Sequence, residues 1–357
     1  MASEVQPLPR SKTAVDGFAS LGVAIRLLSA ACLLVVTSQW ALADQQGTKP
    51  ASPTADSAVE PVPKPASFEP GRLERVKALG NPMLEGSVPT YYTPGYKQRA
   101  GRLQTFFSDE LQFAQRQFQF HLAVSLAVLD PAQYALTEHQ MPYPTPSCTG
   151  DPPVAMMPVN WIGGPDILPK EKDASAAVLK AVAAHRLSWN DAGRRAYDLW
   201  GGHELGHSIL EAYGINPGTR WLNEFVASYV LYAYLESKHP EQLWLIDVLE
   251  VGGRPDQPQG YVSLDDLDSK FLQIAVTDPR NYLWYQAQFF ERIKKVYRRQ
   301  GVDFLRALRR AFPDGAYKFA TLGTADTLHR LDTIDPEFSA WARHLESMPR
   351  TNQFVVH

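Results

Sequence analysis

Cysteine is scarce in this sequence, with two in 357 residues, and one of them, Cys32, lies in an apolar N-terminal stretch. If that stretch is removed on export, Cys148 is the only thiol left and no intramolecular disulfide can form. No Gly-x-Ser-x-Gly motif occurs, so a serine hydrolase has little support. Positive charge is not in excess either, because 35 Lys and Arg stand against 38 Asp and Glu, which gives no sign of nucleic-acid binding.

Long apolar runs are also scarce in this sequence. The run at 27–40 covers about fourteen residues, whereas a membrane-spanning helix needs about 20. Basic residues precede it and Ala41-Leu42-Ala43 follows it, which is the pattern of a secretory signal peptide with a small-residue cleavage site. We therefore expect residues 1–43 to be a signal peptide and the mature protein to be exported, either periplasmic or secreted. An uncleaved anchor is the alternative, and only then would the protein associate with a membrane.

Composition divides the rest of the chain into a linker and a folded part. Residues 44–70 are rich in Pro, Ala and Ser, which predicts a semi-extended linker. Residues 71–357 are enough for one domain with a substantial core. Periodicity predicts a helix at 101–118, a strand at 120–129 and a candidate edge strand at 153–161. Strands followed by helices favour the α+β class. Beyond these strands we expect mostly helices, at 173–186, 191–213, 221–238, 264–275, 281–300, 302–312 and 336–347.

The most informative motif is the HExxH run His-Glu-Leu-Gly-His at 203–207, within a predicted helix. Side chains four positions apart lie on the same face of a helix, so His203 and His207 can bind one Zn²⁺. Glu204 lies between them and can take a proton from water as a general base. A chance HExxH is expected in roughly one of a hundred chains of this length. The alternative is a surface helix whose histidines merely follow helical spacing.

A third ligand is expected from Glu224, which opens the next predicted helix. The surrounding sequence, Trp-Leu-Asn-Glu-Phe-Val-Ala-Ser-Tyr, resembles the WLNEGFAxY segment of the gluzincin metallopeptidases, the clan of thermolysin and the aminopeptidase N-like enzymes. This resemblance implies that His203, His207 and Glu224 hold one zinc ion per chain, with Glu204 as the base. It also implies a thermolysin-like zincin catalytic domain, in which a small mixed sheet packs on a mostly helical lobe.

The sequence departs from the aminopeptidase N-like family in three places. Phe225 stands where the family has Gly after the ligand Glu, and the gap between His207 and Glu224 is two residues shorter than in the family. The Gly-x-Met-Glu-Asn strand that grips the substrate amine in the exopeptidases is also missing, because the segment at 153–161 contains no Glu. The resemblance therefore does not extend to aminopeptidase specificity.

Hydrolysis of an amide also needs a hydrogen-bond donor for the oxyanion that develops. In the aminopeptidase-like branch this donor is a Tyr at the start of a helix that runs to a Gly. Tyr285 and Gly301 have the matching spacing, so Tyr285 is the first candidate and Tyr282 is its rival. Because the chain has 15 Tyr, a purely structural role for either is a strong alternative. Asn223 and Ser228 are candidates for orienting the metal ligands from behind.

Together these patterns predict an exported zinc metallopeptidase that hydrolyses peptide bonds in a peptide or protein substrate. Two alternatives stay open. The fold could belong to a non-catalytic envelope protein that binds a partner and keeps the metal site as a scaffold, although such a role does not need Glu204. The same zinc centre could also cleave a different bond, such as an ester or an epoxide.

Overall fold

The computed structural model describes residues 71–139, 141–160, 170–253, 259–313 and 322–350. Internal contacts divide the chain into Met1–Phe68 and Glu69–His357, and every described residue belongs to the second unit. The signal peptide and the linker predicted from the sequence therefore lie outside the described residues. Within the described ranges, no helix is both long and apolar enough to cross a membrane.

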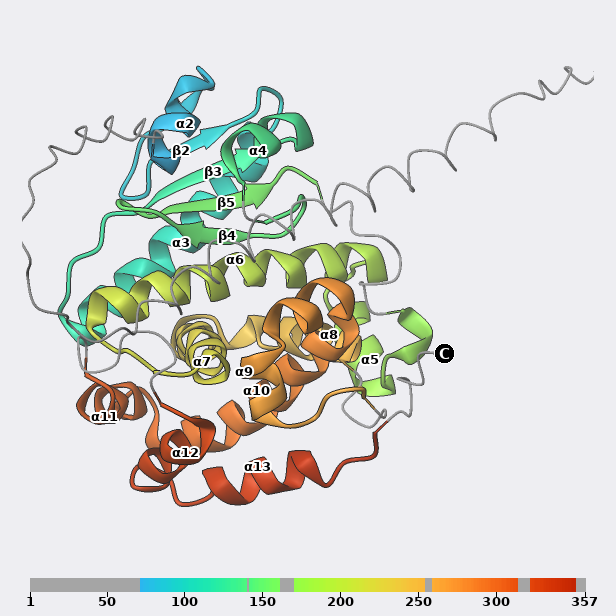
Figure 1. Cartoon of the computed structure of the whole chain (residues 1–357). Helices are drawn as coiled ribbons and strands as arrows, with labels where there is room; N and C mark the ends of the chain where they lie inside the picture. The colour runs from blue at the N-terminus through green and yellow to red at the C-terminus, as the bar shows by residue number, and fades with distance from the viewer. Residues whose placement is uncertain (1–70, 140, 161–169, 254–258, 314–321, 351–357) are drawn as a thin grey trace, which may run out of the picture. The chain divides into compact units, whose positions relative to one another are not determined.

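The first half of the described chain contains a five-stranded mixed sheet with the order β1-β2-β3-β5-β4 (Figure 1). The central strands β2, β3 and β5 are parallel, whereas β1 and β4 pair antiparallel at the two edges. The segment predicted to be an edge strand is therefore interior, and β4 takes the edge. All five residues of β5 are buried, because its side chains enter an apolar core on each face of the sheet. The strands are β1 Met83–Leu84, β2 Thr90–Tyr92, β3 Ser125–Leu129, β4 Ser147–Thr149 and β5 Val154–Pro158.

Helices cover both faces of the sheet. Successive side chains of β3 and β5 point to opposite faces, so each strand contributes to two separate apolar cores. One core lies toward α2 (Arg72–Ala78) and α4 (Pro131–Thr137), and the larger one lies toward α3 (Lys97–Phe118) and α6 (Trp189–Tyr213). The smaller core contains Val76, Ala127, Leu129, Tyr134, Val154 and Met156.

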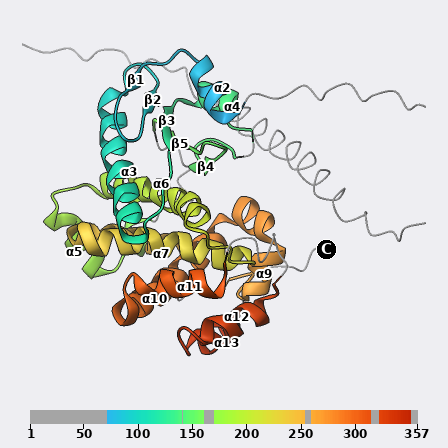
Figure 2. The ribbon, with the colours of Figure 1, turned by 90° about the vertical axis from the view of Figure 1, so that its left-hand side faces the viewer.

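The second half of the described chain is helical, and α6 lies between it and the sheet (Figures 1 and 2). α6 contacts β4 and β5 on one side and the helices α7 and α8 on the other, while α10 packs against α7 and α8. The helices of this part are α5 Ala176–Ala184, α7 Arg220–Lys238, α8 Trp244–Gly253, α9 Leu264–Ser269, α10 Pro279–Gln300, α11 Asp303–Ala311, α12 Thr324–Asp332 and α13 Phe338–Glu346, with short turns η1 Glu171–Asp173, η2 Pro240–Gln242 and η3 Gln273–Thr277. The α+β class predicted from the sequence is confirmed.

Local signals set the ends of the two helices that matter most below. α6 begins after Ser188, whose side chain accepts a hydrogen bond from the backbone N–H of Asp191. It ends at Gly214, whose φ of 80° is in the left-handed region that favours glycine. The first turn of α7 is capped by a residue far away in the sequence, because the N–H of Trp221 donates to Asp268 Oδ1 at 3.0 Å. The start of α7 is thus tied to α9.

Glycines let α6 approach its neighbours closely. A Cβ added at Gly206 would lie 2.7 Å from the backbone oxygen of Ala227 in α7, so the two helices touch at this point. A Cβ at Gly202 would lie 2.6 Å from Glu110 Oε2 of α3. Both glycines lie within one turn of the HExxH histidines. Their missing side chains therefore determine how near the motif comes to the facing helices.

An aromatic cluster surrounds Phe225, the residue that replaces Gly in the resemblance described above. Its ring lies 5.8 Å from that of Phe289, 5.5 Å from that of Phe338 and 6.1 Å from that of Trp341, measured between centroids. Phe225 is fully buried by these contacts between α7, α10 and α13. A large side chain at this position is therefore part of the core, and the departure from the family pattern has a structural reason.

Candidate metal centre

The HExxH motif lies in the middle of α6 and forms a compact group of possible metal ligands. Donor atoms of His203, Glu204 and His207 all lie within 4.8 Å of one another, so this group could hold a metal ion. His203 is completely buried, whereas Glu204 and His207 are partly exposed. A bound ion would therefore contact the protein interior through His203 and would be accessible from the side of Glu204 and His207.

Glu224 of α7 faces the two histidines across the close contact at Gly206. Its Oε2 lies 3.2 Å from Nε2 of His203, and its Oε1 lies 3.7 Å from Nε2 of His207. The carboxylate thus spans both imidazoles. Glu224 is therefore a further candidate ligand beside the group of His203, Glu204 and His207.

A chain of hydrogen bonds sets the orientation of His203. Its Nδ1 lies 2.9 Å from Ser228 Oγ, and Ser228 Oγ donates to Gln286 Oε1 at 2.9 Å. A hydroxyl has a single hydrogen, so Ser228 accepts from the Nδ1–H of His203. Nδ1 of His203 therefore carries a proton. The hydrogen bond between its Nε2 and Glu224 Oε2 at 3.2 Å needs a second proton, and a metal ion would replace that proton so that Nε2 presents a lone pair.

The same chain returns to Glu224 and closes a ring. Gln286 Nε2 donates to Glu224 Oε2 at 3.1 Å and to the Tyr282 hydroxyl oxygen at 2.9 Å, and the Tyr282 hydroxyl donates to Glu224 Oε2 at 2.7 Å. The side-chain carbonyl of Gln286 thus accepts from Ser228, which contacts His203, and its amide group donates to Glu224 and Tyr282. Sequence analysis missed this residue, although its position one helical turn after Tyr282 was a usable signal.

His207 is oriented in the same way by a separate partner. Its Nδ1 lies 3.1 Å from Asn223 Oδ1, which can only accept, so the proton is again on Nδ1. Ser228 and Asn223 therefore contact the two imidazoles from behind, as the sequence suggested. Such partners are characteristic of metal-binding histidines, because they set the tautomer and direct the other nitrogen toward the ion.

The donor set fits a metal ion. Two Nε2 lone pairs and a carboxylate converge on one point, and without a positive charge between them these groups repel one another. Imidazole nitrogens and carboxylate oxygens are the donors that several divalent metals take. With His203, His207 and Glu224 as its ligands, such an ion would have a fourth coordination position for water or substrate. His203, His207 and Glu224 could therefore hold one ion.

The charges in the centre shift the pKa of each group. Burial raises the pKa of Glu204 to about 7. Burial would also raise the pKa of Glu224, but the hydrogen bond from His203, the two imidazoles and Tyr282 outweigh it and hold this pKa at about 2. Burial lowers the pKa of His207. Burial also lowers the pKa of His203, but the hydrogen bond to Glu224 and the attraction of its negative charge outweigh burial and raise this pKa overall. A positive charge is favoured between His203 and Glu224, and a metal ion can supply it in place of a proton.

Tyr285, the first candidate for an oxyanion donor, does not face this centre. It is fully buried, and its hydroxyl donates to the backbone oxygen of Ser263 at 2.7 Å. The rival Tyr282 is the tyrosine whose hydroxyl lies at the centre. The structure therefore does not bring Tyr285 to this centre. It lies three positions after Tyr282, about 60° further round α10, where its hydroxyl meets Ser263.

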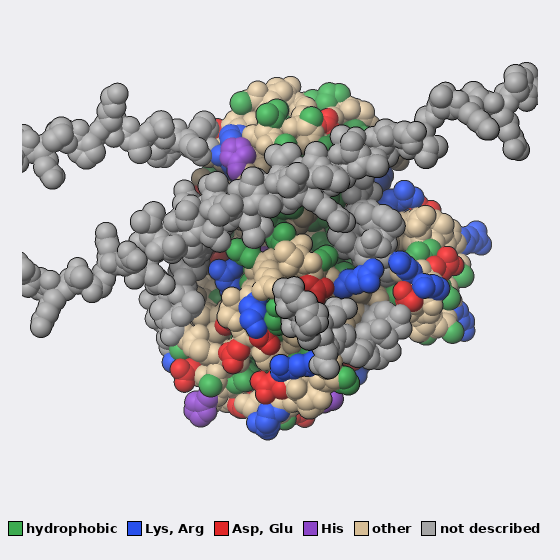
Figure 3. Space-filling view, turned by 45° about the vertical axis from the view of Figure 1, so that its right-hand side comes forward, with side chains coloured by type: hydrophobic (Ala, Val, Ile, Leu, Met, Phe, Trp, Pro, Cys, Tyr) green, Lys and Arg blue, Asp and Glu red, His purple; other side chains and the backbone are tan. Residues whose placement is uncertain are grey.

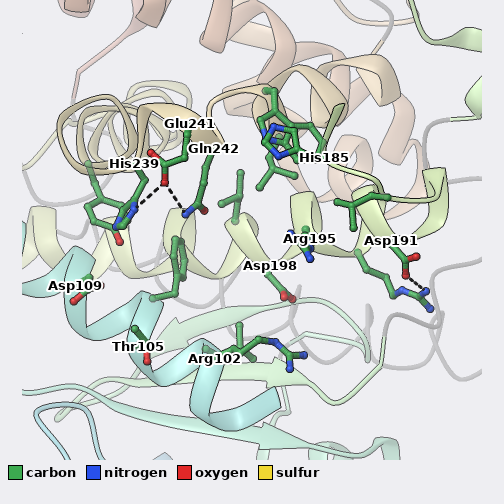
Figure 4. A pocket seen from close by; sticks show the side chains of 18 of the residues that line it. Arg102, Thr105, Asp109, His185, Asp191, Arg195, Asp198, His239, Glu241 and Gln242 are labelled. Atoms are coloured by element: carbon green, nitrogen blue, oxygen red, sulfur yellow. Dashed lines mark hydrogen bonds and ion pairs between the residues drawn. The ribbon is translucent and has the colours of Figure 1, made fainter. Parts of the chain in front are cut away.

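A cavity of about 770 Å³ lies elsewhere on α6, between α3, the N-terminal half of α6 and the corner between α7 and α8 (Figure 4). None of the three candidate ligands lines it. The metal centre is thus identified by its chemistry and not by the size of a cavity. Comparison of the chain with protein-family models, with curated proteins and with solved structures finds no match.

Proposed function

We propose that this chain is an exported zinc metallopeptidase of the gluzincin type, with a thermolysin-like catalytic domain. The observation that carries the proposal is the convergence of two correctly oriented imidazoles and a buried carboxylate beside a second, partly exposed carboxylate. A structural metal site would need the first three groups only. Glu204, which is left over and has a pKa near neutrality, supports catalysis over a scaffold role.

Zn²⁺ held by His203, His207 and Glu224 would act as a Lewis acid that makes water more acidic and polarises a carbonyl. Glu204 then accepts a proton from the attacking water and passes it to the leaving amine. A pKa of about 7 suits both steps, because the carboxyl group can exchange its proton readily near neutral pH. Ser228, Gln286 and Asn223 hold the ligands in position throughout.

Tyr282 replaces Tyr285 as the proposed donor to the oxyanion. Its hydroxyl lies beside Glu224, and burial together with the negative charge of Glu224 raises its pKa, which keeps it protonated. Because Tyr282 has a single hydroxyl hydrogen, which it donates to Glu224, it must turn that hydrogen toward the oxyanion when the negative charge develops. Tyr282→Phe should lower kcat by about tenfold to a hundredfold while the metal stays bound. Tyr285→Phe is the matched control, since its hydroxyl contacts Ser263 instead, and it should leave kcat unchanged.

The sheet supports a peptide as the substrate. The antiparallel edge strand β4 contacts α6, the helix that carries the HExxH motif. An extended peptide can add to such an edge through main-chain hydrogen bonds, which an ester or epoxide substrate would not use. The sequence at 221–229 supports the gluzincin assignment.

Metal content by mass spectrometry, wild type beside Glu224→Ala, is the first test. We expect one zinc per chain in the wild type and a large loss in the variant. Glu204→Gln should then retain the metal while peptide turnover falls by about 10²- to 10⁴-fold. Unchanged turnover in Glu204→Gln would contradict the proposed base. Zinc without any peptide turnover would favour the binding protein, and turnover of esters alone would favour a different bond.

A further inference from the structure

The cavity between α3 and α6 has an unusual distribution of charge. It opens on a different face of α6 from the metal centre, since Arg195 and Asp198 line it while His203 and His207 do not. Its volume of about 770 Å³ is in the range of sites for small ligands. In Figure 4, Asp109 and Glu241 lie toward one end, and Arg102, Arg195 and Asp198 lie further along the groove.

One end of the groove is positive. Arg99 binds Asp198 with both nitrogens, at 2.8 and 3.3 Å, so these two charges are matched. Burial raises the pKa of Asp198, and the nearby charges of Arg99, Arg102 and Arg195 oppose that rise. Three guanidinium groups thus surround one carboxylate, which leaves an excess of two positive charges. Arg102 and Arg195 are exposed, and no hydrogen-bond or ion-pair partner is found for either among the described residues.

The other end is negative. Asp109 and Glu241 line it, and both are exposed. Glu241 already accepts hydrogen bonds from His239 at 3.3 Å and from Gln242 at 3.5 Å, but its charge is not matched by a Lys or Arg among the described residues. Asp109 lies two turns after Arg102 on α3, so the ends are about 10 Å apart at 1.5 Å per residue. This separation is about one Debye length, and the two ends do not neutralise each other across solvent.

Apolar side chains lie between the charged ends. Leu103 and Phe106 come from α3, Leu199 comes from α6, and Tyr234 comes from α7. The rings of Phe106 and Tyr234 meet edge to face at 5.8 Å. The groove therefore combines a positive end, an apolar middle and a negative end. A ligand that matches it carries an anion and a cation about 10 Å apart with an uncharged body between them.

We propose that this groove binds a zwitterionic ligand of the length of a short peptide. Its carboxylate would lie at Arg102 and Arg195, whose planar guanidinium groups suit a carboxylate, and its ammonium group would lie at Asp109 and Glu241. An extended chain covers about 3.4 Å per residue, so three residues span the distance between the ends. A free phosphate would match the positive end only, and a nucleic acid would be repelled by the negative end. The proposal goes beyond the metallopeptidase function and does not depend on it.

Calorimetric titration of the full chain with tri-alanine tests the proposal. Glu204→Gln is used as the background so that the peptide is not consumed. Tri-alanine should bind, and N-acetyl-tri-alanine and tri-alanine amide should each bind at least tenfold more weakly, because each lacks one charge. Equal binding of the free and blocked peptides, or no binding of tri-alanine, would overturn the proposal. Inorganic phosphate that binds as well as tri-alanine would show a simple anion site and would overturn it too.

Variants at the two ends locate the binding. Arg102→Gln combined with Arg195→Gln should weaken tri-alanine by at least tenfold, and the exposed Arg343→Gln in α13 should leave it unchanged. Asp109→Asn should weaken tri-alanine but not the N-acetylated peptide, which already lacks the ammonium group. This second variant keeps the test decisive if the double arginine variant is unstable. Peptide binding that survives all of these changes would place it elsewhere, for example at the metal centre, and would contradict the groove.

Discussion

The polar groups on the two faces of α6 differ in their burial and in their hydrogen-bond partners. On the face toward α7 and α10, His203 and Glu224 are buried, and a closed ring of hydrogen bonds runs through Ser228 and Gln286. On the face toward α3, Arg102 and Arg195 stay exposed, and the described residues offer them no direct partner. A buried polar group without a partner costs free energy, whereas water satisfies an exposed one. Burial thus explains why only the first face has a complete network.

The difference also determines what each face can bind. In the ring, Glu224 accepts hydrogen bonds from Gln286 and Tyr282, and its carboxylate faces both Nε2 atoms, so a cation between these groups would be stabilised. In the groove, charges of both signs remain, about 10 Å apart along α3. Its ligand therefore has to carry both signs. The same helix presents a preorganised centre on one side and an adaptable surface on the other.

The largest effect is expected from Gly206→Ala, because the added methyl group would push α6 and α7 apart beside the candidate ligands. The added Cβ would lie 2.7 Å from the backbone oxygen of Ala227, and a backbone atom cannot move as a side-chain end can. We expect a loss of about 1–3 kcal/mol in the free energy of unfolding, measured with denaturant, together with loss of metal. Gly101→Ala in α3 is the control, since its Cβ meets only Leu84 Cδ1 at 3.9 Å. It should be stabilising by about 0.5–1 kcal/mol, and equal losses in both variants would refute the packing argument.

Ser228→Ala opens the ring without changing the helix packing. It removes the acceptor of the His203 Nδ1–H and the donor to Gln286 Oε1. Metal affinity should fall by about tenfold to a hundredfold in a competition titration against a chromogenic chelator. Ser237→Ala is the matched change on the same helix, where the hydroxyl contacts only Tyr297 at the surface, and it should leave the affinity unchanged. The same affinity in both variants would show that the ring does not orient His203.

A third effect concerns Glu110 of α3, which packs against α6 at Gly202. The residue is fully buried, neither carboxyl oxygen has a hydrogen-bond partner among the described residues, and burial raises its pKa well above 4.5. The folded state therefore keeps a proton that the unfolded state releases above about pH 4.5, so stability falls as the pH rises through this window. The slope from this group is at most about 1.4 kcal/mol per pH unit.

Glu110→Gln removes this titration and keeps the shape of the side chain. Its free energy of unfolding, relative to the wild type, should increase steadily as the pH is raised from acid to neutral. Urea unfolding of both proteins across that pH range gives the comparison. Parallel pH curves would mean that Glu110 is not protonated in the folded protein.

Sequence patterns predicted the longest helices, because the relevant signals are local, but they missed α2, α4, α8 and α12. The helix predicted at 191–213 is found at 189–213, and Ser188 and Gly214 terminate it as caps should. The strands were less predictable. Only 125–129 of the strand predicted at 120–129 pairs with neighbours, and the predicted edge strand lies between β3 and β4. The order of strands depends on pairing between distant segments, which alternation of residue types does not encode.

The same contrast holds at the candidate metal centre. The spacing of His203 and His207 follows from helix geometry alone, and Glu224 was found because of its surrounding motif. Choosing between Tyr282 and Tyr285 required the rotation of α10 about its axis, which packing against α7 and α9 decides. Gln286 belongs to no motif, and its role depends on Ser228 of another helix. Contacts between helices are therefore the part that the sequence did not reveal.

Phe225 follows the ligand Glu224 directly, and two of its ring neighbours, Phe338 and Trp341, belong to α13, the last helix of the described chain. A ribosome makes the chain from the N-terminus, so α7 lacks part of its core until these residues have emerged. The candidate ligands are all made more than a hundred residues earlier. A centre whose ligands lie within a short stretch of sequence thus depends for its final packing on a helix that is synthesised more than a hundred residues later.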